Sequence, residues 1–291
     1  TLNTTTGVIT YSSVSAVGSD TLTQFTITAT STEGGTSTRQ FGITVKAPQI
    51  TTFNSPGTFT VPASLTSVNV LMVAGGGGGA AEPGNNGPGG GGAGGLIYRP
   101  AFPISAGSPI SVTVGSGGQG GTSSQPSAGN SPQGITGGAP NAFGANGSDT
   151  TFGPLTAKGG GAGACPRDYA GQGQGNPGGS GGGCVAMGGS PNTGGSATQP
   201  GQSGDSGTYG FGNAGGGIPN GSDGQIGGGG GGAGAAGGNG SGDAYASDSG
   251  SLPSVTGQGY GKGGVGKQYS ISGSAVYYAG GGSGHVANSS G

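Results

Sequence analysis

The stretch "GGGGGGAGAAGGNGSG", from Gly227 to Gly242, decides the fold of this chain. It has no large apolar side chain, so it cannot form a core strand or an amphipathic helix, each of which needs apolar residues at a fixed period. Its glycines at 228, 231, 234, 237 and 240 share one register of three. Three residues per turn is the period of the polyproline II helix, which makes no internal hydrogen bonds and leaves its amides for neighbouring chains. The stretch therefore predicts extended glycine helices that pack side by side through main-chain bonds.

The composition allows two interpretations of these glycine runs. Of 291 residues, 82 are Gly and 18 are Pro, only 29% are apolar and Trp is absent, so bulky side chains are too few to fill a core along the whole chain. One alternative is a flexible Gly/Ser linker. Inserts such as "YGFGNAGGG" and "AVYYAGGGSG" place aromatic residues next to glycine, which linkers usually lack. These inserts favour the packed form, held largely by backbone hydrogen bonds.

The charge balance excludes two classes of partner. Charged residues make up 5% of the chain and the net charge is -2, so no basic stripe is present to neutralise phosphates. The sequence also lacks an apolar stretch of about 18 residues. We therefore expect neither nucleic-acid binding nor membrane insertion.

Residues 1–48 show the pattern of an immunoglobulin-like β fragment. Phe25 and Ile27 alternate with Thr, and after "TEGGTS" Phe41 and Ile43 alternate again, which predicts two long strands joined by a hairpin turn. The preceding "LNTTTGVITY" resembles a sequence found in bacterial and phage immunoglobulin-like modules. Such a module needs about 100 residues, so we expect the chain to begin inside a domain.

Residues 49–115 predict a β-rich collar that leads into the glycine-rich region. Phe59 and Val61 are expected to oppose Val68, Val70 and Met72 in a second hairpin, and "PISVTVGSGG" predicts a further strand. Residues 116–291 are then expected to form a polyglycine II domain with variable loops. The predicted fold class is mainly β and irregular, with essentially no α-helix.

The residues that could carry chemistry are few and scattered. His285 is the single histidine and has no Cys or carboxylate cluster near it in the sequence, so neither a metal site nor a catalytic triad is predicted. We expect no enzymatic activity and no cofactor. Cys165 and Cys184 are the two cysteines, and the sequence leaves open whether they form a disulfide or remain thiols.

Recognition is the remaining class of function. Three inserts combine Tyr, Asn, Ser and Asp, residue types that antibody loops use for adaptable contacts. The candidate receptor-binding residues in them are Arg167, Asp168, Tyr169, Tyr209, Phe211, Asp243, Tyr245, Asp248 and Tyr260. The alternative for any one of them is a turn whose aromatic side chain packs against the glycine runs.

Four segments carry a family resemblance: "VNVLMVAGGGGGA", "GGGGAGGLIY", "ISVTVGSGGQGG" and "GSAVYYAGGGSG". They resemble the glycine-rich domain of phage tail-fibre and virion proteins, of the marine phage type. More loosely, the chain is similar to the distal tail-fibre adhesins of T-even-type phages, whose polyglycine II helices present loops to the host. The related domains commonly end in an apolar strand that this sequence lacks after "GGGSGHVANSSG", so we expect both ends to belong to a longer fibre polypeptide.

The resemblance implies an extracellular adhesin. Its partners would be a host cell-surface glycan or outer-membrane protein and other fibre subunits, with a homotrimer expected by analogy. Two alternatives stay open. One is a structural filament or virion decoration protein without receptor binding, and the other is an ice-binding protein, which the irregular inserts disfavour.

Overall fold

The computed structural model describes residues 19–63, 65–81, 87–122, 144–165, 173–185, 192–218, 226–240 and 261–285. The chain divides into two compact units, Thr1–Thr52 and Phe53–Gly291. The described residues are mainly β, in several small antiparallel sheets, with a single five-residue helix. The predicted fold class is thus confirmed.

The first unit contains one long hairpin. Strands β1 (Thr21–Thr30) and β2 (Thr36–Val45) pair antiparallel, and Gly34 supplies the positive φ of +85° that the turn needs. Phe25 lies opposite Phe41, and their rings stack with centroids 5.8 Å apart. The alternation that predicted two strands therefore also sets their register, because it places both rings on one face.

Two sheets at one end of the second unit form what we call the collar from here on, with strands from both sides of residue 115. One has the order β3 (Gly57–Thr60), β6 (Pro109–Thr113), β7 (Thr150–Phe152) and β8 (Leu155–Ala157). The other has the order β4 (Ser67–Val73), β5 (Leu96–Pro103) and β9 (Gly210–Phe211). The predicted hairpin of β3 with β4 is wrong, since β3 pairs with β6 and β4 pairs with β5. The apolar alternation of both strands reflects burial between the sheets instead of pairing with each other.

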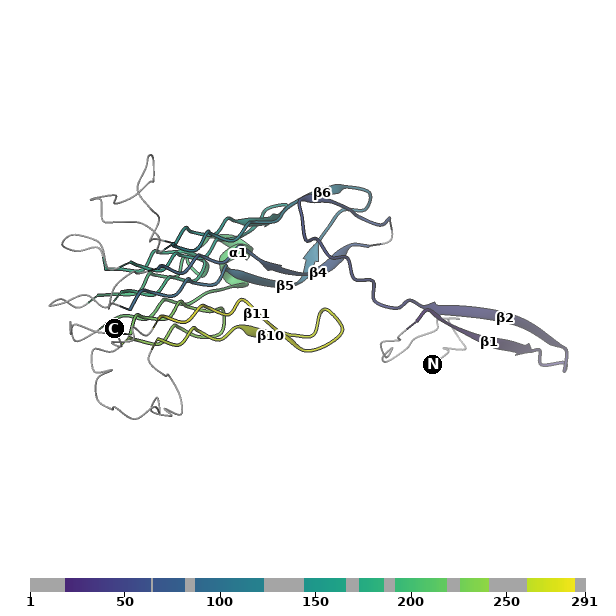
Figure 1. The fold of residues 1–291 in the computed structure, drawn as a ribbon. Helices are drawn as coiled ribbons and strands as arrows, with labels where there is room; N and C mark the ends of the chain where they lie inside the picture. The colour runs from purple at the N-terminus through teal and green to yellow at the C-terminus, as the bar shows by residue number, and fades with distance from the viewer. Residues whose placement is uncertain are drawn as a thin grey trace, which may run out of the picture. The chain divides into compact units, whose positions relative to one another are not determined.

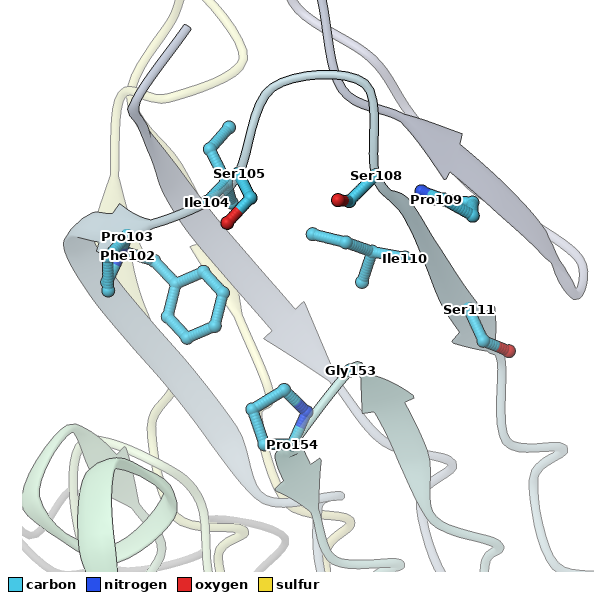
Figure 2. A pocket seen from close by; sticks show the side chains of 10 residues that line it. All are labelled: Phe102, Pro103, Ile104, Ser105, Ser108, Pro109, Ile110, Ser111, Gly153 and Pro154. Carbon is cyan, nitrogen blue, oxygen red and sulfur yellow. The ribbon is translucent and has the colours of Figure 1, made fainter.

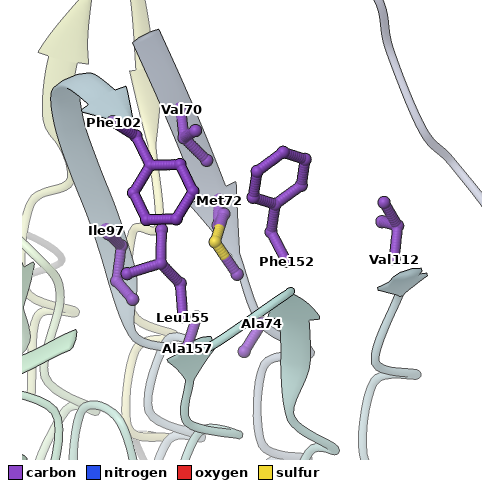
Figure 3. Packing of buried hydrophobic residues seen from close by; sticks show 9 residues of the cluster. All are labelled: Val70, Met72, Ala74, Ile97, Phe102, Val112, Phe152, Leu155 and Ala157. Carbon is purple, nitrogen blue, oxygen red and sulfur yellow. The ribbon is translucent and has the colours of Figure 1, made fainter. Parts of the chain in front are cut away.

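A compact apolar cluster fills the space between these sheets (Figure 3). Phe152 of β7 is central to it, with ring centroids 5.8 Å from Phe102 and 5.9 Å from Phe59. The buried members come from both sheets and are Val70, Met72, Ala74, Ile97, Phe102, Val112, Phe152, Leu155 and Ala157. Burial of these side chains gives this end of the unit an ordinary hydrophobic core.

The glycine-rich runs continue directly from the collar strands and lie side by side (Figure 1). We call this part the glycine bundle; among the described residues it includes 74–81, 87–95, 114–122, 144–149, 158–165, 173–185, 192–198, 212–218, 226–240, 261–266 and 279–285. It therefore uses segments from both sides of residue 115. Strands β7, β8, β9, β10 (Lys267–Tyr269) and β11 (Val276–Tyr278) lie beyond that residue.

Hydrogen bonds in the bundle repeat every three residues. The amides of Gly227, Gly230 and Ala233 donate to the carbonyls of His285, Gly282 and Ala279, with N···O distances of 3.1, 2.8 and 2.9 Å. The amides of Gly228 and Gly231 donate to Cys184 and Gly181, whereas those of Gly229 and Gly232 donate to Gly238 and Ala235. Three successive amides thus point to three different neighbours, which is the pattern of a polyglycine II helix. Residues 227–240 are therefore packed structure.

Close backbone contact explains why this packing needs glycine. A Cβ placed on Gly91 would lie 2.1 Å from the carbonyl oxygen of Gly77, and one on Gly229 would lie 2.0 Å from that of Lys262. Such approaches also allow Cα–H···O contacts between runs. Glycine is therefore a steric requirement at these close contacts between runs.

Candidate functional site

The residues that border the connecting segments between runs of the bundle meet at one of its ends. Gly95 is bonded to Lys158 where the runs leave the collar, while Gly89, at the other end of the same run, is bonded to Ala164. At that other end the Sγ of Cys165 donates to the carbonyl of Ala81 at 3.3 Å. Further bonds there join Val185 to Gly173, Asn192 to Ile218, and Gly227 to His285. We call this end, opposite the collar, the insert end.

Most of the predicted receptor-binding residues belong to the connecting segments and lie outside the described residues. They are Arg167, Asp168, Tyr169, Asp243, Tyr245, Asp248 and Tyr260. Their described neighbours in sequence, Cys165 and Gly240, are at the insert end. The chain therefore leaves the bundle for both segments at this end.

Tyr209 lies with the collar instead. It follows helix α1 (Gly204–Thr208), and its amide donates to the carbonyl of Asp205 at 3.0 Å. The guanidinium of Arg99 on β5 stacks over its ring, 4.5 Å from the centroid, and also donates to the carboxylate of Asp205 at 2.6 Å. This ion pair raises the pKa of Arg99. Tyr209 is half-buried against the core, so its described contacts are structural.

Phe211 takes part in a second aromatic layer, on the other side of β5. The ammonium of Lys267 lies 4.0 Å from the Phe211 ring centroid, and Tyr269 packs on Tyr98 with centroids 4.5 Å apart. Lys267 and Tyr269 are two residues apart on β10, so both side chains face the sheet of β5 and β9. Burial raises the pKa of Tyr269. These contacts hold the β10–β11 hairpin against the collar.

The two cysteines occupy neighbouring runs near the insert end. Gly161 donates to Ser180 and Ala164 to Gly183, so the runs are parallel and Cys165 and Cys184 are at matching positions. No disulfide joins them. Both side chains are buried but have different surroundings: Cys165 donates to Ala81, whereas Cys184 packs with Ile218. Burial raises the pKa of the Cys184 thiol to about 12.

Gln199 is a buried polar residue that sequence reasoning missed. Its Oε1 accepts a bond from the amide of Lys158 at 2.7 Å, and its Nε2 donates to the carbonyls of Ser206 at 2.8 Å and Thr156 at 3.3 Å. The side chain is fully buried and links β8 to α1. One glutamine in "SATQPGQSG" gives no local signal of this role, because its partners are distant in sequence.

The collar carries a shallow groove with little chemical capacity (Figure 2). It is lined by Phe102, Ile104, Ser108, Ile110, Gly153 and Pro154, among others, and no lining residue is charged. Within the described ranges, no three His, Cys, Asp or Glu side chains gather in a way that could hold a metal ion. No helix among the described residues is long and apolar enough to cross a membrane.

Comparison with known proteins gives one family. The model of a family described as "Glycine-rich domain" matches residues 51–290, which corresponds closely to the second unit. No curated protein and no solved structure matches the chain. Since the matched region spans most of the sequence, the protein belongs to this glycine-rich domain family.

Proposed function

We propose that this protein is a non-enzymatic component of an extracellular phage fibre, which binds the host surface through the insert end of its glycine bundle. The observation that carries the proposal is that the connecting segments between runs begin and end at the insert end. The described ends of the runs meet there, away from the collar, as the bonds of Cys165 to Ala81 and of Gly240 to Gly217 illustrate. The connecting segments therefore begin and end at one end of a rigid support.

Rigidity follows from how completely the main chain is paired. Every amide from Gly227 to Ala235 donates to a described carbonyl. Each bond contributes only about 1 kcal/mol net, but together they offset the large backbone entropy that glycine loses on folding. A support of this kind keeps binding loops in place without a large hydrophobic core.

The proposed contact residues are those of the two segments rich in Tyr and Asp. These are Arg167, Asp168 and Tyr169 in one segment, and Asp243, Tyr245, Asp248 and Tyr260 in the other. Tyr and Asp provide apolar area and hydrogen bonds suited to a glycan or an outer-membrane protein. Tyr209 and Phe211 are left out of this surface because Arg99 and Lys267 stack on them within the collar.

Binding of the labelled chain to a panel of bacterial cells and to their isolated surface glycans tests the proposal. Variants Tyr169→Ala and Tyr245→Ala should weaken binding, whereas Tyr277→Ala should leave it unchanged, because Tyr277 is an exposed tyrosine on β11, outside the two proposed segments. Equal loss in all three variants would contradict the proposed surface. Failure to bind any cell or glycan, combined with growth into filaments, would favour the structural alternative.

A further inference from the structure

The run 114–122 contains main-chain groups that have no hydrogen-bond partner in the part of the chain that the structure describes. Its amides at Gly118 and Gly121 donate to Gly76 and Gly79, both at 2.8 Å. Gly117 and Gly120, by contrast, make no main-chain hydrogen bond through either amide or carbonyl to any described residue. Both are exposed. Since they are three residues apart, they form one outward-facing row in the register of the helix.

Steric requirements within one chain do not explain why this row is glycine. A Cβ on Gly118 would lie 1.9 Å from the carbonyl oxygen of Ala145, so glycine is required there. A Cβ on Gly117 or Gly120 would have no heavy atom nearer than 3.7 or 3.9 Å. Most glycines at contacts between runs of the bundle would place a Cβ at about 2 Å from a carbonyl oxygen, as Gly91 does with Gly77 at 2.1 Å. The outward row of Gly117 and Gly120 thus has the composition of a contact between two runs, but no described run lies against it.

The adjacent run 74–80 extends the same face. Gly76 and Gly79 donate through their amides to no described acceptor, and a Cβ on either would find its nearest atom at 3.7 or 3.8 Å. Neither this run nor 114–122 contains a charged residue or a proline. Natural proteins usually protect an exposed hydrogen-bonding edge with such residues. This edge has no such protection along a length of about 25 Å.

We propose that this face, formed by runs 74–80 and 114–122, pairs with the same face of a second copy about a twofold axis. The face is self-complementary: among the described residues, the amides of Gly76, Gly79, Gly117 and Gly120 and the carbonyls of Gly117, Gly118 and Gly120 have no main-chain partner. A twofold axis brings the donors of each copy to the acceptors of the other. The contact is narrow, so association is weak and depends on concentration.

Light scattering coupled to size exclusion, on the full chain at concentrations up to about 1 mM, tests this pairing. The wild type should shift from monomer to dimer as concentration rises. The double variant Gly117→Ala/Gly120→Ala should stay monomeric with an unchanged melting temperature, because both methyl groups fit the monomer but collide with a docked run. The matched control Gly201→Ala adds a methyl at an exposed collar position with its nearest atom at 3.7 Å, and should still dimerise.

Hydrogen exchange supplies a second measurement that does not depend on the variants. The amides of Gly117 and Gly120 should become protected as the concentration of wild-type protein rises. A monomer at every concentration, a trimer, or a dimer that persists in the double variant would each overturn the proposal. Host binding is measured separately, so failure of this pairing leaves the proposed function unaffected.

Discussion

Gly230 lies so close to Gly91 that a Cβ on Gly230 would be 2.0 Å from the carbonyl oxygen of Gly91. The two residues are far apart in sequence but belong to adjacent runs, linked by the bonds of Gly90 to Gly228 and of Ala93 to Gly231. Backbone against backbone is the main form of packing in the bundle. At contacts of this kind even the methyl group of alanine is too large.

The first prediction concerns this contact. Gly230→Ala should destabilise the second unit by about 3 kcal/mol or more, because the run must move away from Gly91 and break bonds to its neighbours. Gly79→Ala is the matched control, since the nearest atom to its Cβ would be 3.8 Å away. That variant should be neutral or gain up to about 1 kcal/mol through the unfolded state. Chemical denaturation of both variants measures the difference, and equal stabilities would contradict the steric account.

Gln199 gives a prediction about buried polar groups. Gln199→Ala leaves the amide of Lys158 and the carbonyl of Ser206 without their partner, so the free energy of unfolding should fall by about 2–5 kcal/mol. Gln268→Ala on β10 is the control, because that side chain is exposed. It should change stability by less than about 0.5 kcal/mol. Thermal denaturation compares them, and a mild effect of the Gln199 change would show that water replaces the side chain.

The attachment of the β10–β11 hairpin depends on Tyr269. Tyr269→Ala removes the ring that packs on Tyr98 at 4.5 Å and should cost about 1–3 kcal/mol. Tyr277→Ala changes a tyrosine with 67% of its surface exposed and should be close to neutral. Faster hydrogen exchange across β10 in the first variant alone would confirm the local effect. Similar exchange in both variants would be inconsistent with Tyr269 as the attachment point.

Cys184 predicts a loss of stability at alkaline pH. Its thiol has a pKa of about 12 in the folded chain, raised from 9.0 by burial. Below pH 9 the thiol is protonated in both states, whereas between pH 9 and 12 it ionises only in the unfolded chain, so unfolding becomes easier as pH rises. Cys184→Ala should weaken this dependence. Part of it should remain, because Tyr269 also has a raised pKa.

The same burial makes Cys184 unreactive at neutral pH. Iodoacetamide should modify it only after denaturant is added, as mass spectrometry of digested protein can show. Rapid modification of the native protein at neutral pH would mean that the insert end opens around Cys184.

The sequence was most informative where a period repeats. Alternation predicted the hairpin of β1 with β2, and the register of three predicted the pairing of the run that begins at Gly227. The sequence did not predict which strands of the collar pair with each other. Strands β7 and β9 have three and two residues, which is too short to show a period. Which strand β3 joins depends on long-range packing around Phe152, which local pattern does not encode.

The candidate site was predictable only in part. Inserts rich in Tyr and Asp were visible in the sequence, and the common location of their boundaries depends on the alternating direction of the runs. The contacts of Tyr209 with Arg99 and of Phe211 with Lys267 involve residues distant in sequence, so composition alone could not separate these aromatics from the binding candidates.

Hydrogen–deuterium exchange of the amides from Gly227 to Gly234 tests the central claim most directly. Each of these amides donates to a packed carbonyl: those of Gly229 and Gly232 bond to the returning part of the same segment, and the others bond to neighbouring runs. All should therefore be protected, whereas the amides of Gly76 and Gly79 should exchange quickly at low protein concentration and serve as internal references. Uniform protection from Gly227 to Gly234, without the alternation typical of an exposed strand, is the predicted result. Exchange across the segment at the rate of an unstructured peptide would contradict the packed glycine bundle and remove the structural support for the proposed adhesin.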